Sequence, residues 1–498
     1  MAHTLSHSDF REDPVAFTGR GRELRILGSW LERVTSGSGG SAGQALVIKG
    51  RRRIGKTRLV QEFCARSGRP YVFFQATRSQ PAPLARRALF DAVAGGQGMR
   101  DHGAALEHAA APEDWSRTLA AVGAALPYDE PVILVLDEVP WLSEADPGFD
   151  AALKTAWDMH LSAKPVLLLL LGSDLAMMDR LTSYDHPFYG RAGQYTVGPL
   201  SPADVQDSTG LGAGAALDAY LVSGGFPEVV TGWRTGEPVA AYLHRQVEDP
   251  SSVLLTTGER SLAAEFPARL QAGRVLRAIG SGERTFSGIA ASTGGTDGRA
   301  LAHGTLAPIL TELTEAKRIV AADVPLSTQP APKLKRYRIA DTYLRFWLAH
   351  LEDAVAQAER GRGEVSAARI QRSWPSWRGR AVEPVIRESL ARCIPDGLFP
   401  EAVETGGWWN RQNNPEVDLV GADAAPVAGR IHFVGSVKWR DETPFGARDL
   451  QELAAAAQQV PGAQDAPLVA VSRVPPTNAA AEGLAAHWGP EDIIAAWR

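Results

Sequence analysis

Three uninterrupted runs of apolar residues stand out in the first part of the chain. They are ALVIK at 45–49, VILVLD at 132–137 and VLLLLLG at 166–172. Runs without polar alternation are typical of strands that are buried on both faces of a parallel sheet. A helical pattern at 58–68 follows the first run. The order strand, helix, strand predicts an α/β fold with a parallel sheet covered by helices.

Shorter helical segments replace this pattern after residue 260. The segments predicted as helices are 269–282, 286–294 and 301–316, and a strand, a turn rich in proline and lysine at 325–335, and a returning strand at 336–341 follow them. Three short helices with a two-stranded wing predict a winged helix-turn-helix, in which 301–316 would read a DNA groove. Winged helices also dock proteins or act as lids, so both kinds of contact stay open.

The last 120 or so residues predict an α/β module. An amphipathic helix is expected at 376–392, a strand at 407–421, and a second strand at 430–440 that pairs back across the turn 422–429. Alternation along the strands places every second side chain on one face.

Length and composition limit the class of protein. A chain of 498 residues is too long for one hydrophobic core and suggests about three domains. The longest apolar run is too short to span a bilayer, and the N-terminal segment is polar, so we expect no membrane segment. Cys64 and Cys393 lie far apart without metal-ligand spacing, which favours a reducing cytoplasm. The net charge of −5 means that a nucleic-acid site would have to be a local patch.

A phosphate-binding loop follows the first apolar run. Gly50, Gly55, Lys56 and Thr57 satisfy G-x-x-x-x-G-K-[ST] between that strand and a helix. The glycines let backbone N–H groups surround phosphate oxygens at the helix N-terminus. We expect Lys56 to reach the β- and γ-phosphates of ATP and Thr57 to bind Mg²⁺.

Acidic residues end the second apolar run. Asp137 would hold the Mg²⁺ shell, and Glu138 would polarise the attacking water. Ser173 follows the third run, so it would lie beside the same strand ends. It is a candidate sensor of the γ-phosphate, although a plain strand-end turn explains a serine there equally well.

The order of these motifs resembles that of the archaeal-type ATPases of the STAND branch of AAA-like P-loop proteins. The segments that carry the resemblance are FTGRGREL at 17–24, GRRRIGKT at 50–57, LDEVPWL at 136–142, PFYGRAGQYTVGPLS at 187–201 and SGGFPEVV at 223–230. The resemblance implies that Arg20 lies near the nucleotide and that Pro227 touches the base side. It also implies that Arg191 contacts the γ-phosphate or acts in trans on a neighbouring molecule.

The candidate DNA-binding residues lie in the predicted wing and just before the predicted reader helix. They are Lys333, Lys335, Arg336, Arg338 and Arg299. Their positive charges would contact backbone phosphates.

The C-terminal module looks like the restriction-endonuclease-like fold found at the C-terminus of this ATPase family. The family pattern of a helix Glu, an Asp and then Glu-x-Lys falls on Glu383, Asp418 and the stretch from Ser436 to Lys438, with Glu416 nearby. Ser436 stands where the metal-binding Glu would be. Mg²⁺ prefers anionic oxygen ligands, so metal affinity should fall. A degenerate module and a retained nuclease both stay open.

The predicted domains are a P-loop core, a helical lid, a winged helix, a helical linker and a restriction-endonuclease-like module, at residues 1–200, 201–262, 263–345, 346–375 and 376–498. The expected function is an ATP-hydrolysing, Mg²⁺-dependent molecular switch that acts on or near DNA. The alternatives are an ATP-gated nuclease and a scaffold that binds nucleotide without turnover. A homo-oligomer or a protein partner is compatible with each of these functions.

Overall fold

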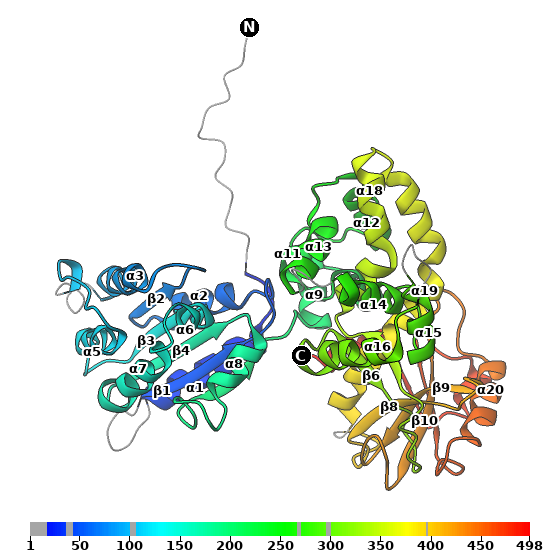
Figure 1. Cartoon of the computed structure of the whole chain (residues 1–498). Coiled ribbons are helices and arrows are strands. Elements are labelled where there is room, and N and C mark those ends of the chain that lie inside the picture. Colours follow the sequence, from blue (N-terminus) through cyan, green and yellow to red (C-terminus); the bar gives the residue numbers. More distant parts are fainter. Residues whose placement is uncertain (1–16, 36–42, 100–105, 266–269, 295–299, 395–396) are drawn as a thin grey trace. The chain divides into compact units, whose positions relative to one another are not determined.

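The computed structural model describes residues 17–35, 43–99, 106–265, 270–294, 300–394 and 397–498. The chain divides into two compact units, residues 1–199 and 200–498 (Figure 1). None of the described helices is both long and apolar enough to cross a membrane.

The first unit is built on a five-stranded parallel sheet with the order β2-β3-β4-β1-β5. Its strands are β1 (Gln44–Lys49), β2 (Tyr71–Gln75), β3 (Val132–Asp137), β4 (Val166–Gly172) and β5 (Gly193–Thr196). Every residue of β3 and β4 is buried, as the continuous apolar runs predict. The predicted α/β fold with a parallel sheet is therefore confirmed for this unit.

Helices supply the remaining layers of the first unit. They are α1 (Gly21–Thr35), α2 (Lys56–Ser67), α3 (Ala82–Ala94), α5 (Trp115–Ala125), α6 (Val139–Ala145), α7 (Phe149–Ala156) and α8 (Leu175–Leu181). Alternate strand residues such as Val72, Leu134 and Leu168 share one core cluster with Phe90 of α3 and Leu119 of α5. This packing fixes the sheet, so the carboxyl ends of its strands form a rigid edge.

The second unit begins with short helices. They are α9 (Pro202–Thr209), α10 (Ala213–Ser223), α11 (Pro227–Val230), α12 (Val239–Glu248) and α13 (Val253–Glu265). A capping box at Ser201 and Asp204 starts α9. Gly224 ends α10 at φ 57°, and a Cβ there would lie 2.3 Å from the backbone nitrogen of Tyr343, so only glycine fits.

Three further helices and an antiparallel hairpin follow in the predicted order. They are α14 (Leu270–Gly280), α15 (Phe286–Ser292), α16 (His303–Thr311), β6 (Val320–Asp323) and β7 (Arg336–Ile339). A π-helical turn, Glu312–Ala316, extends α16. The assignment of these elements as a winged helix stays a prediction.

The loop between β6 and β7, residues 324–335, does not project freely as a DNA-binding wing would. Leu326 is 2% exposed and belongs to the apolar core of the C-terminal sheet. The backbone N–H of Leu326 donates to Gly407, and Ser327 accepts from the N–H of Ala428. These backbone partners hold the loop against the C-terminal module.

The C-terminal elements form a mixed five-stranded sheet with the order β12-β11-β10-β9-β8. Three helices precede the sheet: α17 (Thr342–Phe346), α18 (Glu352–Glu359) and α19 (Gly363–Cys393). Its strands are β8 (Glu404–Trp409), β9 (Glu416–Ala422), β10 (Ile431–Lys438), β11 (Leu468–Ser472) and β12 (Ala486–Trp488). Three helices lie between or after these strands in the sequence: α20 (Ala447–Ala457), α21 (Asn478–Ala481) and α22 (Pro490–Ala495). β8, β9 and β10 are antiparallel, whereas β10, β11 and β12 are parallel.

Two sequence predictions for this region need correction. The predicted strand 407–421 is two paired strands, β8 and β9, joined by the turn-forming residues 410–415. Asn413 adopts φ 57° there, a conformation that asparagine tolerates better than most residues. In addition, the predicted boundary between residues 375 and 376 falls inside the continuous helix α19.

Candidate functional site

The loop that joins β1 to α2 needs glycine at both ends of its motif. A Cβ at Gly50 would lie 2.5 Å from the carbonyl oxygen of Val197, closer than any side chain allows. Gly55 precedes α2 at φ 86°, a left-handed conformation that favours glycine. The loop therefore brings its backbone to the N-terminus of α2, where the helix dipole favours an anion.

Lys56 is folded into this loop. Its side chain is buried, and its Nζ donates to the carbonyl oxygens of Gly50 at 2.8 Å and Arg51 at 3.0 Å. Burial lowers the pKa of Lys56 to about 8, although the nearby carboxylates of Glu138 and Asp137 oppose this shift. The ammonium group is thus held at the mouth of the loop by weak neutral acceptors, which a phosphate oxygen could replace.

Thr57 and Asp137 form the pair that could hold a metal ion. The Thr57 hydroxyl donates to Asp137 Oδ2 at 2.8 Å, and Asp137 is fully buried at the end of β3. Burial raises the pKa of Asp137, which the bond from Thr57 partly offsets. Hydroxyl and carboxylate oxygens are ligands that Mg²⁺ accepts, and their separation matches adjacent positions of an octahedral shell, so these residues fit the ion.

Glu138 and Ser173 contact each other at the neighbouring strand ends. The Ser173 hydroxyl donates to Glu138 Oε2 at 3.0 Å, and the Ser173 N–H approaches the same oxygen at 3.4 Å. Glu138 adopts φ 57°, which is uncommon for a residue other than glycine. Parallel pairing of β3 with β4 brings the two residues together.

Arg20 lies beside the phosphate-binding loop, where its side chain donates hydrogen bonds to backbone carbonyl groups. It is 3% exposed, and its guanidinium donates to Ile54 O and Gly198 O, both at 2.7 Å. The sequence alone gives no sign that this arginine is buried. Its contacts tie the start of the chain and the segment after β5 to the loop, and contact with a nucleotide stays a prediction.

Arg191 is engaged within the first unit. Its Nε and Nη2 donate to the Asp158 carboxylate at 2.7 and 2.9 Å, which raises its pKa. A role toward a γ-phosphate stays a prediction, and it would require this ion pair to open. Pro227 begins α11 in the second unit, and its predicted contact with the base is likewise untested.

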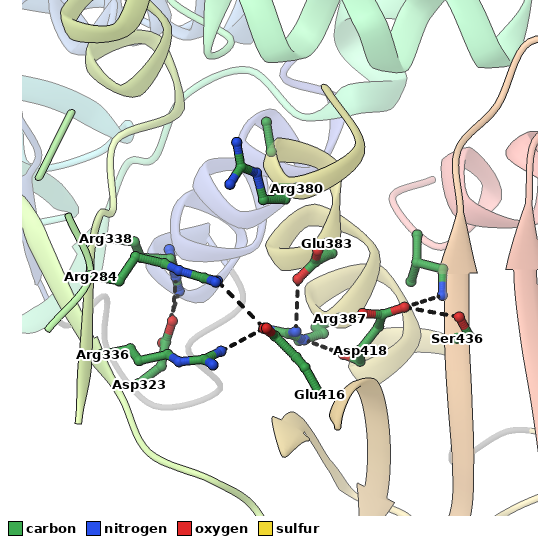
Figure 2. Close-up of polar contacts among 12 residues, drawn as sticks. Arg284, Asp323, Arg336, Arg338, Arg380, Glu383, Arg387, Glu416, Asp418 and Ser436 are labelled. Carbon is green, nitrogen blue, oxygen red and sulfur yellow. Dashed lines mark hydrogen bonds and ion pairs between the residues drawn. The ribbon is translucent and has the colours of Figure 1, made fainter. Parts of the chain in front are cut away.

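The nuclease-like residues lie in the second unit, and their acids already have partners (Figure 2). Asp418 accepts a hydrogen bond from the Ser436 hydroxyl at 3.0 Å and another from the Val437 N–H at 2.8 Å. Glu383 pairs with Arg387 at 3.1 Å, and burial raises the pKa of Glu383 to about 7. Lys438 is half-buried on the same face of β10 as Ser436.

Glu416 is held by arginines. Its Oε1 accepts from Arg336 at 2.5 Å and from Arg284 at 3.4 Å. Among the described residues, no group of three or more histidine, cysteine, aspartate or glutamate side chains is arranged to hold a metal ion. Glu383, Glu416 and Asp418 are each bonded to protein groups, and their role as a nuclease-like site stays a prediction.

Two of the predicted DNA-binding residues, Arg336 and Arg338, form ion pairs with acidic residues of the same unit. Arg336 is 6% exposed, because it pairs with Glu416 and Asn413 and stacks on Trp409 at 4.2 Å. Arg338 pairs with Asp323 at 2.8 Å. Contact of either guanidinium with a DNA phosphate would require these ion pairs to open, and the assignment of both residues to DNA stays a prediction.

The other candidate DNA-binding residues keep their status as predictions. Lys333 and Lys335 are exposed, and Arg299 lies outside the described residues.

Sequence reasoning missed a buried ion-pair network in the second unit. Arg378 donates to Asp218 at 3.1 Å and to Asp441 at 2.9 Å, and Arg473 also pairs with Asp218. Asp218 is the only charged residue in the apolar helix α10, and a single charge in such a helix indicates a buried partner of opposite charge.

Comparison with known families adds two matches. The model of the AAA ATPase domain matches residues 16–169, and a model described as "Archaea bacterial proteins of unknown function" matches residues 347–452. An uncharacterized protein of Methanocaldococcus jannaschii is 24% identical over 429 residues, which cover 85% of this chain and 88% of the relative. The match to the AAA ATPase domain model shows that residues 16–169 are an AAA ATPase domain and that the protein is an ATPase.

Two solved structures illustrate the structural likeness. The Walker-type ATPase of Pyrococcus abyssi has 19% identity and a TM-score of 0.43, with 68% of this chain and 97% of that chain covered. The ORC2 protein of Aeropyrum pernix in its ADPNP–ADP complexes has 14% identity and a TM-score of 0.44, with 70% and 97% covered.

Proposed function

We propose that the first unit binds ATP with Mg²⁺ and that hydrolysis switches the protein between two states. The observation that carries this proposal is the cluster of Lys56, Thr57, Asp137 and Glu138 at one edge of the parallel sheet, with Thr57 already bonded to Asp137. In this arrangement Lys56 would leave the loop carbonyls for the β- and γ-phosphates. Thr57 and Asp137 would hold Mg²⁺, which supplies positive charge for the transferred phosphoryl group.

Glu138 is the residue that we assign to the attacking water. Its carboxylate would have to leave Ser173 before it could accept a hydrogen bond from that water, because Ser173 donates to Glu138 Oε2. This exchange gives Ser173 a role in coupling the state of the nucleotide site to the availability of the base.

The switch assignment rests on the resemblance to STAND ATPases in the order of the motifs. In such a switch, the helices α9 to α13 would form a lid that closes when ATP binds. Slow ATP hydrolysis would then restore the open arrangement of these helices. The alternative of a scaffold without turnover is disfavoured by the presence of Glu138 at the end of β3.

We further propose that the C-terminal module is a degenerate nuclease that acts on or near DNA without cutting it. The order of secondary-structure elements, α19, β8, β9, β10, α20 and β11, supports a restriction-endonuclease-like fold. The hydrogen bond from Ser436 to Asp418 and the ion pair of Arg336 with Glu416 argue against metal binding by these two acids. Contact with DNA would depend on Lys333 and Lys335. The alternative, an ATP-gated nuclease, predicts Mg²⁺-dependent cleavage that Lys438→Ala abolishes.

ATP turnover of the full chain, measured with and without duplex DNA, tests the ATPase assignment. Lys56→Ala should lose nucleotide binding, whereas Glu138→Gln should keep binding and lower turnover by about 100-fold or more, because a general base is removed. Glu144→Gln is the matched control, since Glu144 is an exposed glutamate on α6. Wild-type turnover in Glu138→Gln would refute the role given to Glu138.

A further inference from the structure

Arginine is the most frequent residue type in the lining of a small cavity in the second unit. The cavity has a volume of about 100 Å³ and lies among the end of α14, the hairpin β6–β7, α17, α19 and the paired strands β8 and β9. Its six arginines are Arg284, Arg336, Arg338, Arg345, Arg380 and Arg387. Since one water molecule needs roughly 10–15 Å³ of such space, the cavity has room for a group larger than water.

The acids of the cavity neutralise only part of this charge. Three carboxylates line it: Asp323 pairs with Arg338, Glu383 with Arg387, and Glu416 with both Arg336 and Arg284 (Figure 2). Arg345 and Arg380 have no carboxylate partner among the described residues. The lining therefore carries an excess of three positive charges when all three acids are ionised.

Arg345 shows the consequence of this excess. Its guanidinium donates only to backbone, at 3.0 Å to Arg380 O and 3.3 Å to Ala381 O. Burial lowers the pKa of Arg345 to about 10, and the charges of Arg338 and Arg380 act in the same direction. Arg345 is half-buried, and the more distant carboxylates of Glu383 and Asp323 only partly offset the burial and the neighbouring positive charges, so an anion in the cavity would stabilise its charged form.

Arg380 is the side chain best placed to take a ligand. It is exposed at the rim, and its guanidinium makes no hydrogen bond or ion pair with any residue that the structure describes. Figure 2 shows it on α19, one turn from Glu383, without a bonded partner.

We propose that this arginine-lined cavity binds a phosphate group with two negative charges, either free phosphate or a phosphate monoester. A planar guanidinium presents paired N–H donors that match phosphate oxygens. The cavity is small, which favours a terminal phosphate over an internal phosphodiester with a chain on each side. This site is distinct from the phosphate-binding loop of the first unit and does not depend on ATP hydrolysis.

Calorimetric titration of the full chain with inorganic phosphate, and separately with sulfate, tests the proposal. The Lys56→Ala background weakens the competing site at the phosphate-binding loop. In that background Arg380→Ala should raise the Kd by about fivefold to tenfold, as expected for the loss of one charge-assisted hydrogen bond. Arg369→Ala should leave the Kd unchanged, since Arg369 is exposed on the same helix outside the cavity.

A second variant moves the affinity in the opposite direction. At pH 8, where Glu383 is mostly ionised, Glu383→Gln removes a negative charge from the lining and the carboxylate partner of Arg387 Nη2, so it should lower the Kd for sulfate, whereas mere loss of folding would raise it. The proposal is overturned if neither anion binds at millimolar concentration in the Lys56→Ala background. It is also overturned if Arg380→Ala and Arg369→Ala behave alike.

Oligonucleotides distinguish the source of the phosphate. A 5′-phosphorylated strand that binds more tightly than the same strand with a 5′-hydroxyl, with the difference lost in Arg380→Ala, supports a nucleic-acid end as ligand. Equal binding of both strands, together with phosphate binding that responds to Arg380→Ala, supports a free phosphate. Equal binding of both strands that Arg380→Ala weakens, without any binding of inorganic phosphate, overturns the assignment to a terminal phosphate.

Discussion

Replacement of Arg336 separates a structural role from a role in DNA binding. The Arg336 guanidinium joins the hairpin β6–β7 to β9 through Glu416 and to the turn before β9 through Asn413, and it stacks on Trp409 of β8. Arg336→Ala removes all three contacts at once. A residue that served DNA could be lost without a change in the stability of the free protein.

The expected cost can be worked from these contacts. Breaking a buried ion pair costs about 3–5 kcal/mol, and a cation–π contact adds about 1 kcal/mol. Glu416 is 29% exposed and keeps Arg284 at 3.4 Å, so the loss at the ion pair falls below that range. We expect local opening of β8 and β9 to become about 3 kcal/mol easier, which corresponds to roughly 150-fold faster amide exchange.

Hydrogen–deuterium exchange of peptides that cover β8 and β9 measures this change directly. Arg338→Ala is the matched control, because the Arg338–Asp323 pair is partly exposed and should contribute less than about 1 kcal/mol. If Arg336→Ala changes exchange in β8 and β9 no more than Arg338→Ala does, the structural reasoning is wrong.

Three further perturbations test other parts of the second unit. The folded-state pKa of Glu383 is raised to about 7, so its contribution to stability is complete below about pH 4.5 and is lost as pH rises through 7. Urea unfolding should therefore show Glu383→Gln gaining about 2.5 kcal/mol over wild type between pH 5 and pH 8, whereas parallel pH profiles would contradict this shift. Joint replacement of Lys333 and Lys335 by Ala should weaken DNA binding and reduce its salt dependence by about two charges in mobility-shift titrations, and unchanged binding would place the contact elsewhere. Ser436→Glu would set a second carboxylate beside Asp418, a repulsion of about 4 kcal/mol at an effective dielectric constant of 20. Mg²⁺ or Mn²⁺ should therefore stabilise that variant against heat but not wild type, and Asp418→Ala in the same background should abolish the effect.

The first unit was largely predictable, because its signals are local. The apolar runs of β1, β3 and β4 specify buried parallel strands whichever helices cover them. Gly50 and Gly55 are required by backbone conformation, so the loop motif carries its own geometry. The contact of Glu138 with Ser173 joins residues that are 35 positions apart, and it follows only from the pairing of β3 with β4.

The second unit was less predictable, because distant contacts decide the roles of its charged residues. In the sequence, Arg336 and Arg338 stand beside two lysines and resemble a basic wing. Their acidic partners are Glu416, on another sheet, and Asp323, on the opposite strand of the hairpin. No pattern within the segment distinguishes an arginine that binds DNA from one that neutralises a distant carboxylate.

The docking of residues 324–335 on the C-terminal sheet also sets an order of events during biosynthesis. Glu416 lies 80 residues after Arg336 in the chain. At a synthesis rate of about 5–20 residues per second, the hairpin would wait roughly 4–16 s for this partner after leaving the ribosome. Through that interval Leu326 and the arginines of β7 would be solvent-exposed, so the nascent hairpin is the segment that we expect a chaperone to shield.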